Sequence, residues 1–274
     1  MKGDHAVTTD PTGVDARSVE PMRADLTNAR ALVTGAGHGI GRAIAVALAQ
    51  AGADVAVHYG HSAEAAEETA ATIAGLGRRA KTFAGDVRDT GQVNAFVADA
   101  VEFLGGLDVL VTNAGHLVGR VPVAEMTDEH WHHVLDVNLT STFLTCRAAL
   151  PSLAAARGRI VTMASLAAHN GGGPGAVAYA AAKAGVVGFT KGLAREVGPH
   201  GVTVTAVAPG FIAGTAFHDT FTAPEARRGI VGTIPVGRAG TPEDVAAAVV
   251  YLASPASRFA SGAVLDLTGA QWTR

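Results

Sequence analysis

A glycine-rich segment near the start of the chain, Thr34–Gly41 (TGAGHGIG), constrains the fold more than any other feature. It follows the apolar run 31–34 and precedes 42–50, where Ile44 and Leu48 repeat at helical spacing. This order of strand, glycine-rich turn and helix is typical of dinucleotide binding, because glycines permit a tight turn and a helix N-terminus offers unpaired N–H groups to phosphate. The spacing is G-x-x-x-G-x-G rather than the commoner G-x-G-x-x-G, so a plain strand-to-helix turn is the alternative.

Strand-like and helix-like patterns alternate along the rest of the chain. Apolar or β-branched runs, each expected to form a strand, occupy 30–34, 54–58, 80–84, 107–112, 158–164, 202–207 and 263–267. Helices are expected to begin after Asp89, with Gln92 as its capping partner, and after Thr241, which Pro242 and two acids follow. The alternation predicts an α/β fold: a single doubly wound (Rossmann) domain with a seven-stranded parallel sheet flanked by helices, and a site beyond the carboxyl ends of its strands.

Composition supports a single domain and argues against some classes of binding partner. The chain has 274 residues, 48% of them hydrophobic, which suffices for a single core over 26–274. Residues 1–25 lack apolar periodicity and are expected to form a flexible N-terminal tail, or to pack across a neighbouring subunit. A net charge of −3 argues against a nucleic-acid partner, and the lack of a secretory signal or of a run of ~20 apolar residues predicts a cytoplasmic protein without a membrane partner.

Tyr179 and Lys183 lie four residues apart in a segment of helical character, so their side chains share one helix face. A free phenol has a pKa near ~10, and a neighbouring ammonium lowers this pKa by favouring the phenolate. If Ser165, from an upstream strand end, holds a substrate oxygen, Tyr179 becomes a candidate acid/base for a carbonyl or an alcohol. Taken alone, the same residues are an exposed helix pair and a turn serine.

Further motifs follow one another along the chain. They are the glycine-rich segment, Asp86 after the third strand, Asn113-Ala-Gly115, Asn138, Ser165, Tyr179-x-x-x-Lys183 and Pro209-Gly210. In this order they resemble the short-chain dehydrogenase/reductase family over about residues 26–274. The stretches 165–210 and 234–244 are most similar to ketoreductases of the 3-ketoacyl-carrier-protein reductase type.

The resemblance implies a role for each of four catalytic residues. Tyr179 would exchange a proton with the substrate oxygen, and Ser165 would orient that oxygen. Lys183 would lower the pKa of Tyr179 and hydrogen-bond the nicotinamide ribose. In the family, the counterpart of Asn138 kinks a helix and holds a water of the proton relay; taken alone, Asn138 is a polar group inside a helix.

Two groups of residues are expected around these four. The cofactor site is expected to comprise Gly35, Gly37, His38, Gly39, Ile40, Gly41, Tyr59, His61, Ser62, Asp86, Val87, Asn113, Ala114, Gly115, Tyr179, Lys183, Pro209, Gly210 and Ile212. The substrate pocket is expected to comprise His116, Ser165, Leu166, Gly172, Phe211 and Phe217. The aromatic residues Phe211, Phe217 and Phe221, with His218, form either a mobile lid or packing against the core.

The end of the second strand bears on the choice of cofactor. NAD-binding folds commonly place an acid about ~20 residues past the glycines to bond the ribose 2′-OH. Here Tyr59, His61 and Ser62 follow that strand, and no carboxylate comes before Glu64. We therefore expect NADP(H), with His61, Ser62 and His38 as donors, whereas NAD(H) stays possible if these histidines are ordinary exposed loop residues.

The remaining features concern metal binding and the class of substrate. His130, His132 and His133 cluster in one helix, yet no metal is expected because the chemistry is supplied without one; the single Cys146 is expected to be a buried hydrophobe. Carrier-protein-dependent relatives often carry basic residues where this chain has Arg157 and His200, so a free small ketone or a coenzyme A ester is favoured.

We therefore predict an NADPH-dependent carbonyl reductase with reversible alcohol dehydrogenase chemistry, acting on a small ketone or ketoacyl-type substrate. The alternatives are NAD-linked oxidation of a hydroxyl substrate and a catalytically silent nucleotide-binding regulator. The resemblance also implies a homotetramer, or a homodimer, formed through helices at about 128–155 and 178–197.

Overall fold

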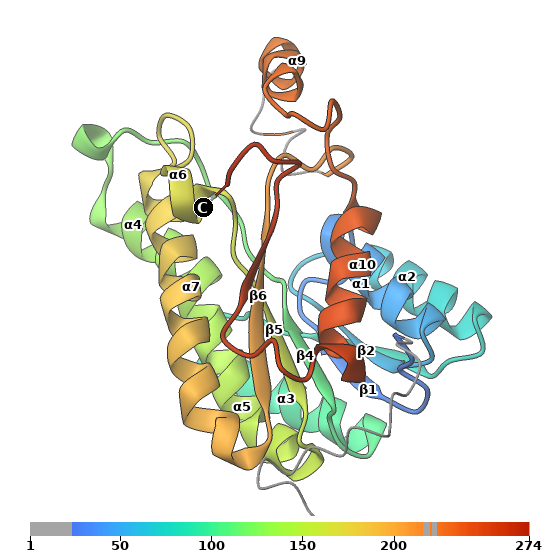
Figure 1. Cartoon of the computed structure of the whole chain (residues 1–274). Coiled ribbons are helices and arrows are strands. Elements are labelled where there is room, and N and C mark those ends of the chain that lie inside the picture. Colours follow the sequence, from blue (N-terminus) through green and yellow to red (C-terminus); the bar gives the residue numbers. More distant parts are fainter. Residues whose placement is uncertain (1–23, 216–219, 221–223, 274) are drawn as a thin grey trace, which may run out of the picture.

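Seven parallel strands form one sheet in the order β3-β2-β1-β4-β5-β6-β7 in this computed structural model, which describes residues 24–215, 220 and 224–273 (Figure 1). The strands are β1 Arg30–Val33, β2 Asp54–Tyr59, β3 Ala80–Ala84, β4 Val109–Thr112, β5 Arg159–Met163, β6 Thr203–Pro209 and β7 Val264–Leu267. Since the chain runs outward from β1 in both directions, the fold is doubly wound, as the alternating pattern predicts. The expected N-terminal tail lies almost wholly outside the described residues.

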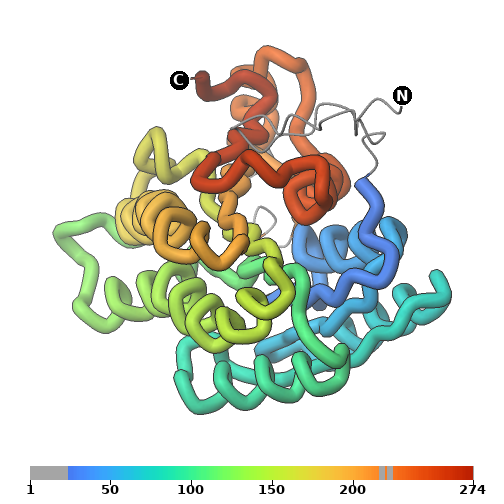
Figure 2. Tube along the Cα trace, turned by 60° about the horizontal axis from the view of Figure 1, so that its bottom comes forward, coloured from blue at the N-terminus to red at the C-terminus, as the bar shows by residue number. Residues whose placement is uncertain are grey.

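Helices connect the strands and cover both faces of the sheet. They are α1 Gly39–Gln50, α2 Ala63–Gly75, α3 Thr90–Leu104, α4 Asp128–Leu135, α5 Ser141–Ala156, α6 Ala167–Asn170, α7 Val177–Val197, α9 Pro224–Gly232 and α10 Pro242–Ala253, with a π-helical turn at Asp136–Thr140 and short 3-10 turns at Val123–Glu125, Gly198–His200 and Pro255–Ser257. The turned view in Figure 2 shows α1, α2 and α10 on one side of the sheet and α3, α5 and α7 on the other.

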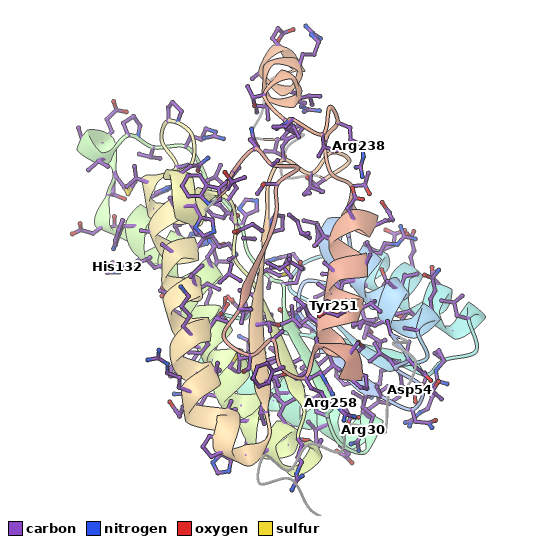
Figure 3. The ribbon with its side chains drawn as sticks, viewed as in Figure 1. Arg30, Asp54, His132, Arg238, Tyr251 and Arg258 are labelled. Carbon is purple, nitrogen blue, oxygen red and sulfur yellow. The ribbon has the colours of Figure 1, made fainter. Side chains whose placement is uncertain are left out.

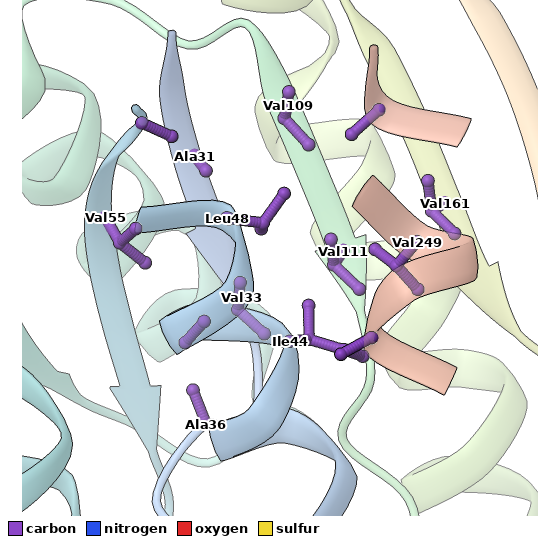
Figure 4. Packing of buried hydrophobic residues seen from close by; sticks show 14 of the residues in the cluster. Ala31, Val33, Ala36, Ile44, Leu48, Val55, Val109, Val111, Val161 and Val249 are labelled. Atoms are coloured by element: carbon purple, nitrogen blue, oxygen red, sulfur yellow. The ribbon is translucent and has the colours of Figure 1, made fainter. Parts of the chain in front are cut away.

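The first of these layers packs on the sheet through small and branched side chains. Ile44 and Leu48 of α1 and Val249 of α10 lie over Val33 and Val111, and all five are fully buried (Figure 4). Because both faces of a parallel sheet are covered, its central strands are continuously apolar rather than alternating, as β4 shows. This packing fixes the start of α1, and with it the glycine-rich turn that leads from β1.

The second layer forms a separate core cluster. It combines Val93 and Phe96 of α3, Leu153 of α5 and Leu193 of α7 with sheet residues such as Leu110. Cys146 lies in this cluster, only 1% exposed, as expected. The layer therefore holds α5 and α7 side by side behind β4 and β5, and α7 carries Tyr179 and Lys183.

Local sequence signals account for the helix ends. The Asp89 side chain accepts a hydrogen bond from the Gln92 amide at the start of α3, and Thr241 and Asp244 form a reciprocal capping box on α10. Asp89 and Thr241 are thus confirmed as helix N-caps, whereas the Gln92 side chain accepts from the Asp86 amide at 2.9 Å and does not complete a box with Asp89. Arg238 adds an ion pair to Asp244 at 2.6 Å, next to the start of α10 (Figure 3).

Of two further helical features, the break within 128–155 was implied only by the family resemblance, and the short helix α6 was not expected. The segment 128–155 is not a regular helix throughout, since a π-helical turn separates α4 from α5 at Asp136–Thr140. The glycine-rich stretch after Ser165 contains the short helix α6 at Ala167–Asn170, where the pattern indicates only a loop. Both features adjoin the carboxyl end of the sheet, so they shape the site.

Candidate active site

A cleft of about 1030 Å³ lies where β1 to β6 end, lined by the segments that follow these strands. Every described residue expected in the cofactor site or the substrate pocket lines this cleft. Among the catalytic candidates, Ser165, Tyr179 and Lys183 also line it, whereas Asn138 is fully buried behind it. Phe217, His218 and Phe221 lie outside the described residues, so the lid prediction is not tested.

The glycine-rich turn is held in place by the segment that follows β4. The Asn113 side-chain amide donates to the carbonyls of Thr34 (3.0 Å) and Gly35 (3.1 Å), and the Ala114 amide donates to the Thr34 hydroxyl (3.0 Å). Gly41 is required at the start of α1, because a Cβ there would overlap the Gly35 carbonyl oxygen and come within 2.5 Å of the Asn113 amide nitrogen. The turn and the Asn113 segment are therefore one interlocked unit.

The N-terminus of α1 fits a phosphate-containing cofactor. The N-cap residue His38 makes no side-chain capping bond, and the first turn of the helix carries no acid. The amide groups of this turn and the positive end of the helix dipole are thus available to an anion. Gly37, Gly39 and the exposed His38 line the cleft beside these amides, so backbone can approach a ligand closely.

The loop after β2 and the turn after β3 lie side by side at one end of the cleft, because their strands are neighbours in the sheet. Tyr59, His61 and Ser62 line the cleft from the first segment. In the second segment Asp86 pairs with Arg88 at 2.6 Å, and the pair lowers the pKa of the Asp86 carboxyl. The Asp86 carboxylate, which interacts with His61, is therefore already paired with a cation. Sequence reasoning did not single out Arg88, although its place two residues after Asp86 was a usable signal.

Asn138 lies in the π-helical turn, and its side chain hydrogen-bonds the loop after β4. Its side-chain amide donates to the carbonyls of His116 (2.7 Å) and Val134 (2.9 Å), and its Oδ1 accepts from the His116 amide (3.1 Å). The helix is thus opened at Asn138, as the resemblance implies. Gly115 leaves room for these hydrogen bonds, because a Cβ there would approach Oδ1 of Asn138 to 2.7 Å and Nζ of Lys183 to 3.1 Å.

Ser165 and Tyr179 meet at the middle of the cleft. Ser165 follows β5 and accepts a hydrogen bond from the Ala167 amide at 3.1 Å, which ties its hydroxyl to the start of α6. Tyr179, in the first turn of α7, hydrogen-bonds Ser165. Burial raises the pKa of the Tyr179 phenol, and the bond to Ser165 offsets part of that rise.

Lys183 lies one helical turn after Tyr179 and is only 4% exposed. Its ammonium donates to the Met163 carbonyl at 2.8 Å and lies 5.7 Å from the centre of the Tyr179 ring. Burial lowers the pKa of Lys183 to about 8. The net pKa of Tyr179 therefore does not fall below its ordinary value, contrary to the expectation, because the effect of burial outweighs that of the neighbouring ammonium, which donates to the backbone.

Two loops close the other side of the cleft. Arg120, from the loop after β4, donates to the Pro174 carbonyl at 3.0 Å, and the Val121 amide donates to the Gly175 carbonyl at 3.0 Å. These bonds join the β4 loop to the glycine-rich stretch that precedes α7. Arg120, His133 and Gln271 line this side with the expected His116, Leu166, Gly172 and Phe211. Arg120 and Gln271 were missed because nothing near them in sequence marks them, and His133 was considered only as a possible metal ligand.

The three clustered histidines of α4 do not converge. His133 lines the cleft, His130 lies against Gly119, and His132 is exposed on the outer side of α4 (Figure 3). Within the described part of the chain, no three His, Cys, Asp or Glu side chains gather as metal ligands would. Over the same residues, no helix has both the length and the apolar character needed to span a membrane.

Comparisons with known proteins agree with this geometry. A family model described as "Enoyl-(Acyl carrier protein) reductase" matches residues 35–269. The 3-oxoacyl-[acyl-carrier-protein] reductase of Synechocystis sp. is 39% identical over 246 residues, which cover 89% of this chain and 97% of that protein.

Solved structures with bound nicotinamide cofactors are also similar. A short-chain dehydrogenase from Burkholderia cenocepacia in complex with NADP has a TM-score of 0.83 and 38% identity, covering 89% of this chain and 98% of that one. A 7α-hydroxysteroid dehydrogenase complexed with NADH and 7-oxo glycochenodeoxycholic acid has a TM-score of 0.85 and 32% identity, with coverages of 90% and 95%.

Proposed function

This chain belongs to the short-chain dehydrogenase/reductase family of oxidoreductases, which act on CH–OH and C=O groups, and on that premise we propose that it is an NADPH-dependent carbonyl reductase. The observation that carries the proposal is the hydrogen-bonded Ser165–Tyr179 pair, with Lys183 buried one turn away, in a cleft lined by the glycine-rich turn. A bound nicotinamide cofactor supplies the hydride.

In this proposal Tyr179 acts as the general acid during reduction. The Ser165 hydroxyl holds the substrate carbonyl oxygen, and the Tyr179 phenol gives that oxygen its proton as the carbonyl becomes an alcohol. The raised pKa of Tyr179 keeps the phenol protonated at neutral pH, which suits an acid. The Lys183 ammonium stabilises the phenolate left behind, and a proton from solvent then restores the phenol.

Two other residues hold this arrangement in place. Asn138 fixes His116 and the loop after β4, and Asn113 fixes the glycine-rich turn. A water on Asn138, as the resemblance implies, would complete the proton path and stays a prediction. We assign Gly35–Gly41, Asp86, Val87, Pro209, Gly210 and Ile212 to the cofactor half of the cleft.

The proposed preference for NADP(H) rests on charge at the end of β2. The described residues of that loop present His61 and Ser62 to the cleft, and the nearby Asp86 charge is paired with Arg88. A 2′-phosphate would therefore meet donors rather than a free carboxylate. One solved relative holds NADP and another NADH, so family membership does not distinguish the two cofactors, and the composition of this loop supports NADP(H).

For the substrate we propose a small ketone or a 3-ketoacyl thioester. The Synechocystis relative is named as a 3-oxoacyl-carrier-protein reductase, which supports the ketoacyl class. Arg157 and His200 offer a thin basic surface for an acidic carrier protein, which favours a free ketone or a coenzyme A ester. We also propose a homotetramer, with exposed Phe143 of α5 and Val177 of α7 as apolar residues available to a second subunit.

The test is fluorescence titration of the protein with NADPH and with NADH, followed by turnover assays on Tyr179→Phe. The assays would contain ketones, a 3-ketoacyl coenzyme A ester and an enoyl thioester. We expect tighter NADPH binding and ketone-dependent oxidation of NADPH that Tyr179→Phe abolishes without changing nucleotide affinity.

Other outcomes of this test point to other functions. Preference for NADH with oxidation of an alcohol would favour NAD-linked dehydrogenation. If only the enoyl thioester were turned over, the group that the enzyme reduces would be a carbon–carbon double bond and not a carbonyl. If the protein bound nucleotide but turned over no substrate, the alternative of a nucleotide-binding regulator would be favoured.

A further inference from the structure

His58, in β2, is a buried polar side chain that links two segments lining the cofactor half of the cleft, one after β1 and one after β3. It is only 1% exposed, and it follows the apolar residues Val55–Val57 of the same strand. Its Nδ1 accepts a hydrogen bond from the Gly35 amide at 3.2 Å, and its Nε2 lies 3.0 Å from the Gly85 carbonyl oxygen. One ring therefore contacts both the glycine-rich turn and the turn that carries Asp86.

These two contacts determine the tautomer of the ring. A backbone amide can only donate, so Nδ1 must be the unprotonated nitrogen, and the hydrogen sits on Nε2, where it is donated to Gly85. A protonated ring would turn a second N–H toward the Gly35 amide and lose that bond. Burial lowers the pKa of His58 to about 4, so the ring is neutral at physiological pH.

The surroundings pack closely against the ring. Phe96 of α3 packs against it with ring centres 4.2 Å apart, and the same phenyl ring presses on Gly85, where a Cβ would come within 2.7 Å. The His58 carbonyl also accepts from the Ala36 amide at 2.9 Å. The charged group that faces the ring is Asp86, whose carboxylate is paired with Arg88.

We propose that His58 is a positioning residue for the cofactor: its Nδ1 holds Gly35, and with it the glycine-rich turn, in the conformation that binds the nucleotide, while Gly85 keeps the ring in the required tautomer. Gly35 has a left-handed backbone (φ 64°) and both Gly35 and Gly85 line the cleft, so the bridge sets the position of the glycine-rich turn relative to the segment after β3. The inference rests on the proposed use of a nicotinamide nucleotide.

Three substitutions separate the two ends of the bridge. His58→Asn keeps an acceptor at the place of Nδ1 but is too short to reach Gly85, whereas His58→Gln places its amide where Nε2 was and leaves Gly35 without its acceptor. His58→Leu removes both polar contacts at similar volume. Each variant loses at least one buried hydrogen bond, so Asn and Gln are matched controls for lost stability.

The experiment measures NADPH dissociation constants by fluorescence, kcat and KM for the cofactor, and the melting temperature of each variant. We expect His58→Asn to bind NADPH within about threefold of the natural protein, and Gln and Leu to weaken binding about tenfold or more. The kcat at saturating cofactor stays within about twofold in all three, because Tyr179, Ser165 and Lys183 are not touched.

Several outcomes would overturn the inference. Equal NADPH affinity in all variants, even with lower melting temperatures, would make His58 a residue of structural importance only. If His58→Asn and His58→Gln weakened NADPH binding equally, the hydrogen bond to Gly35 would be no more important for binding than the bond to Gly85. If the natural protein itself bound neither NADPH nor NADH, the proposed function would fail together with this inference, whereas normal binding by His58→Leu would remove only the inference.

Discussion

Burial changes the acid–base properties of the two central residues in opposite directions. It raises the pKa of the Tyr179 phenol and lowers the pKa of the Lys183 ammonium to about 8. At neutral pH the phenol is therefore protonated and the lysine still charged, which is the combination that a reductase needs when the substrate oxygen must receive a proton. The spacing of these residues in the sequence indicated their pairing but not these pKa shifts.

At the residue scale, Ser165 should affect the chemical step and not nucleotide binding. Its hydroxyl bonds Tyr179 and the Ala167 amide, so Ser165→Ala leaves the phenol without its partner and the substrate oxygen without a donor. We expect kcat/KM for a ketone to fall by about 10²-fold or more. The NADPH dissociation constant should stay unchanged, and Ser165→Thr should retain part of the activity. A similar loss in nucleotide affinity would mean that Ser165 shapes the whole cleft instead.

The lysine predicts an alkaline limit to reduction. Lys183 loses its proton as the pH rises through about 8, and the phenolate formed on Tyr179 then lacks a neighbouring positive charge. We expect kcat/KM for ketone reduction to be level near pH 7 and to fall by about tenfold per pH unit well above 8. A pH–rate profile of the natural protein, with saturating NADPH, measures this. A rate that rises steadily between pH 7 and 9.5 would exclude Lys183 as the titrating group.

At the scale of elements, the unit formed by β1, the glycine-rich turn and α1 depends on close packing to the Asn113 segment. The two are joined by hydrogen bonds from Asn113 and Ala114, while α1 is pressed on the sheet by Ile44 and Leu48. Any side chain added at their contact must separate helix from turn. Some glycines elsewhere in the helices, such as Gly75 of α2, carry no such restriction.

Gly41→Ala and Gly75→Ala therefore have opposite consequences. A Cβ at Gly41 would overlap the Gly35 carbonyl oxygen, so we expect NADPH binding to be lost or weakened more than about 100-fold and the melting temperature to fall. At Gly75 in α2, nothing lies within 4 Å of an added Cβ, so Ala should stabilise the helix by up to about 1 kcal/mol with unchanged activity. Nucleotide titration and urea unfolding measure both effects. Normal binding by Gly41→Ala would refute the close packing described above.

At the scale of the whole molecule, ionisation links the cleft to global stability. Burial depresses the pKa of His58 to about 4, against an ordinary value of 6.5, so between these values the unfolded chain binds a proton that the folded chain does not. The stabilisation from neutral His58 is thus fully present above pH 6.5 and lost as the pH falls toward 4.

We expect this single group to account for about 3 kcal/mol of the free energy of unfolding between pH 6.5 and 4. Urea unfolding of the natural protein and of His58→Asn at both pH values isolates the contribution, since the other titrating groups are common to the two. A pH dependence that is the same in both proteins would show that His58 does not remain neutral in the folded state.

Cofactor binding should also stabilise the whole molecule, because the cleft is lined by segments from six strands and only the folded chain can form it. A ligand at 100 times its dissociation constant adds about 2.7 kcal/mol to the free energy of unfolding. At equal concentration we expect NADPH to raise the melting temperature more than NADH does. Thermal melts with each nucleotide measure this, and a larger shift with NADH would reverse the proposed preference.

The sequence by itself determined the fold class and the sheet, because apolar periodicity, helix caps and glycine turns act between near neighbours in the chain. Its resemblance to the short-chain dehydrogenase/reductase family supplied most residues of the cleft. The sequence also placed the glycine-rich turn at a strand end and Tyr179 one turn before Lys183, and both placements were right. The tertiary structure alone decided the rest: the His58 bridge to Gly35 and Gly85, and the Arg120 bond to Pro174. It also decided the directions of the pKa shifts, since burial and contacts between residues distant in sequence exist only once the sheet and its two helix layers have assembled.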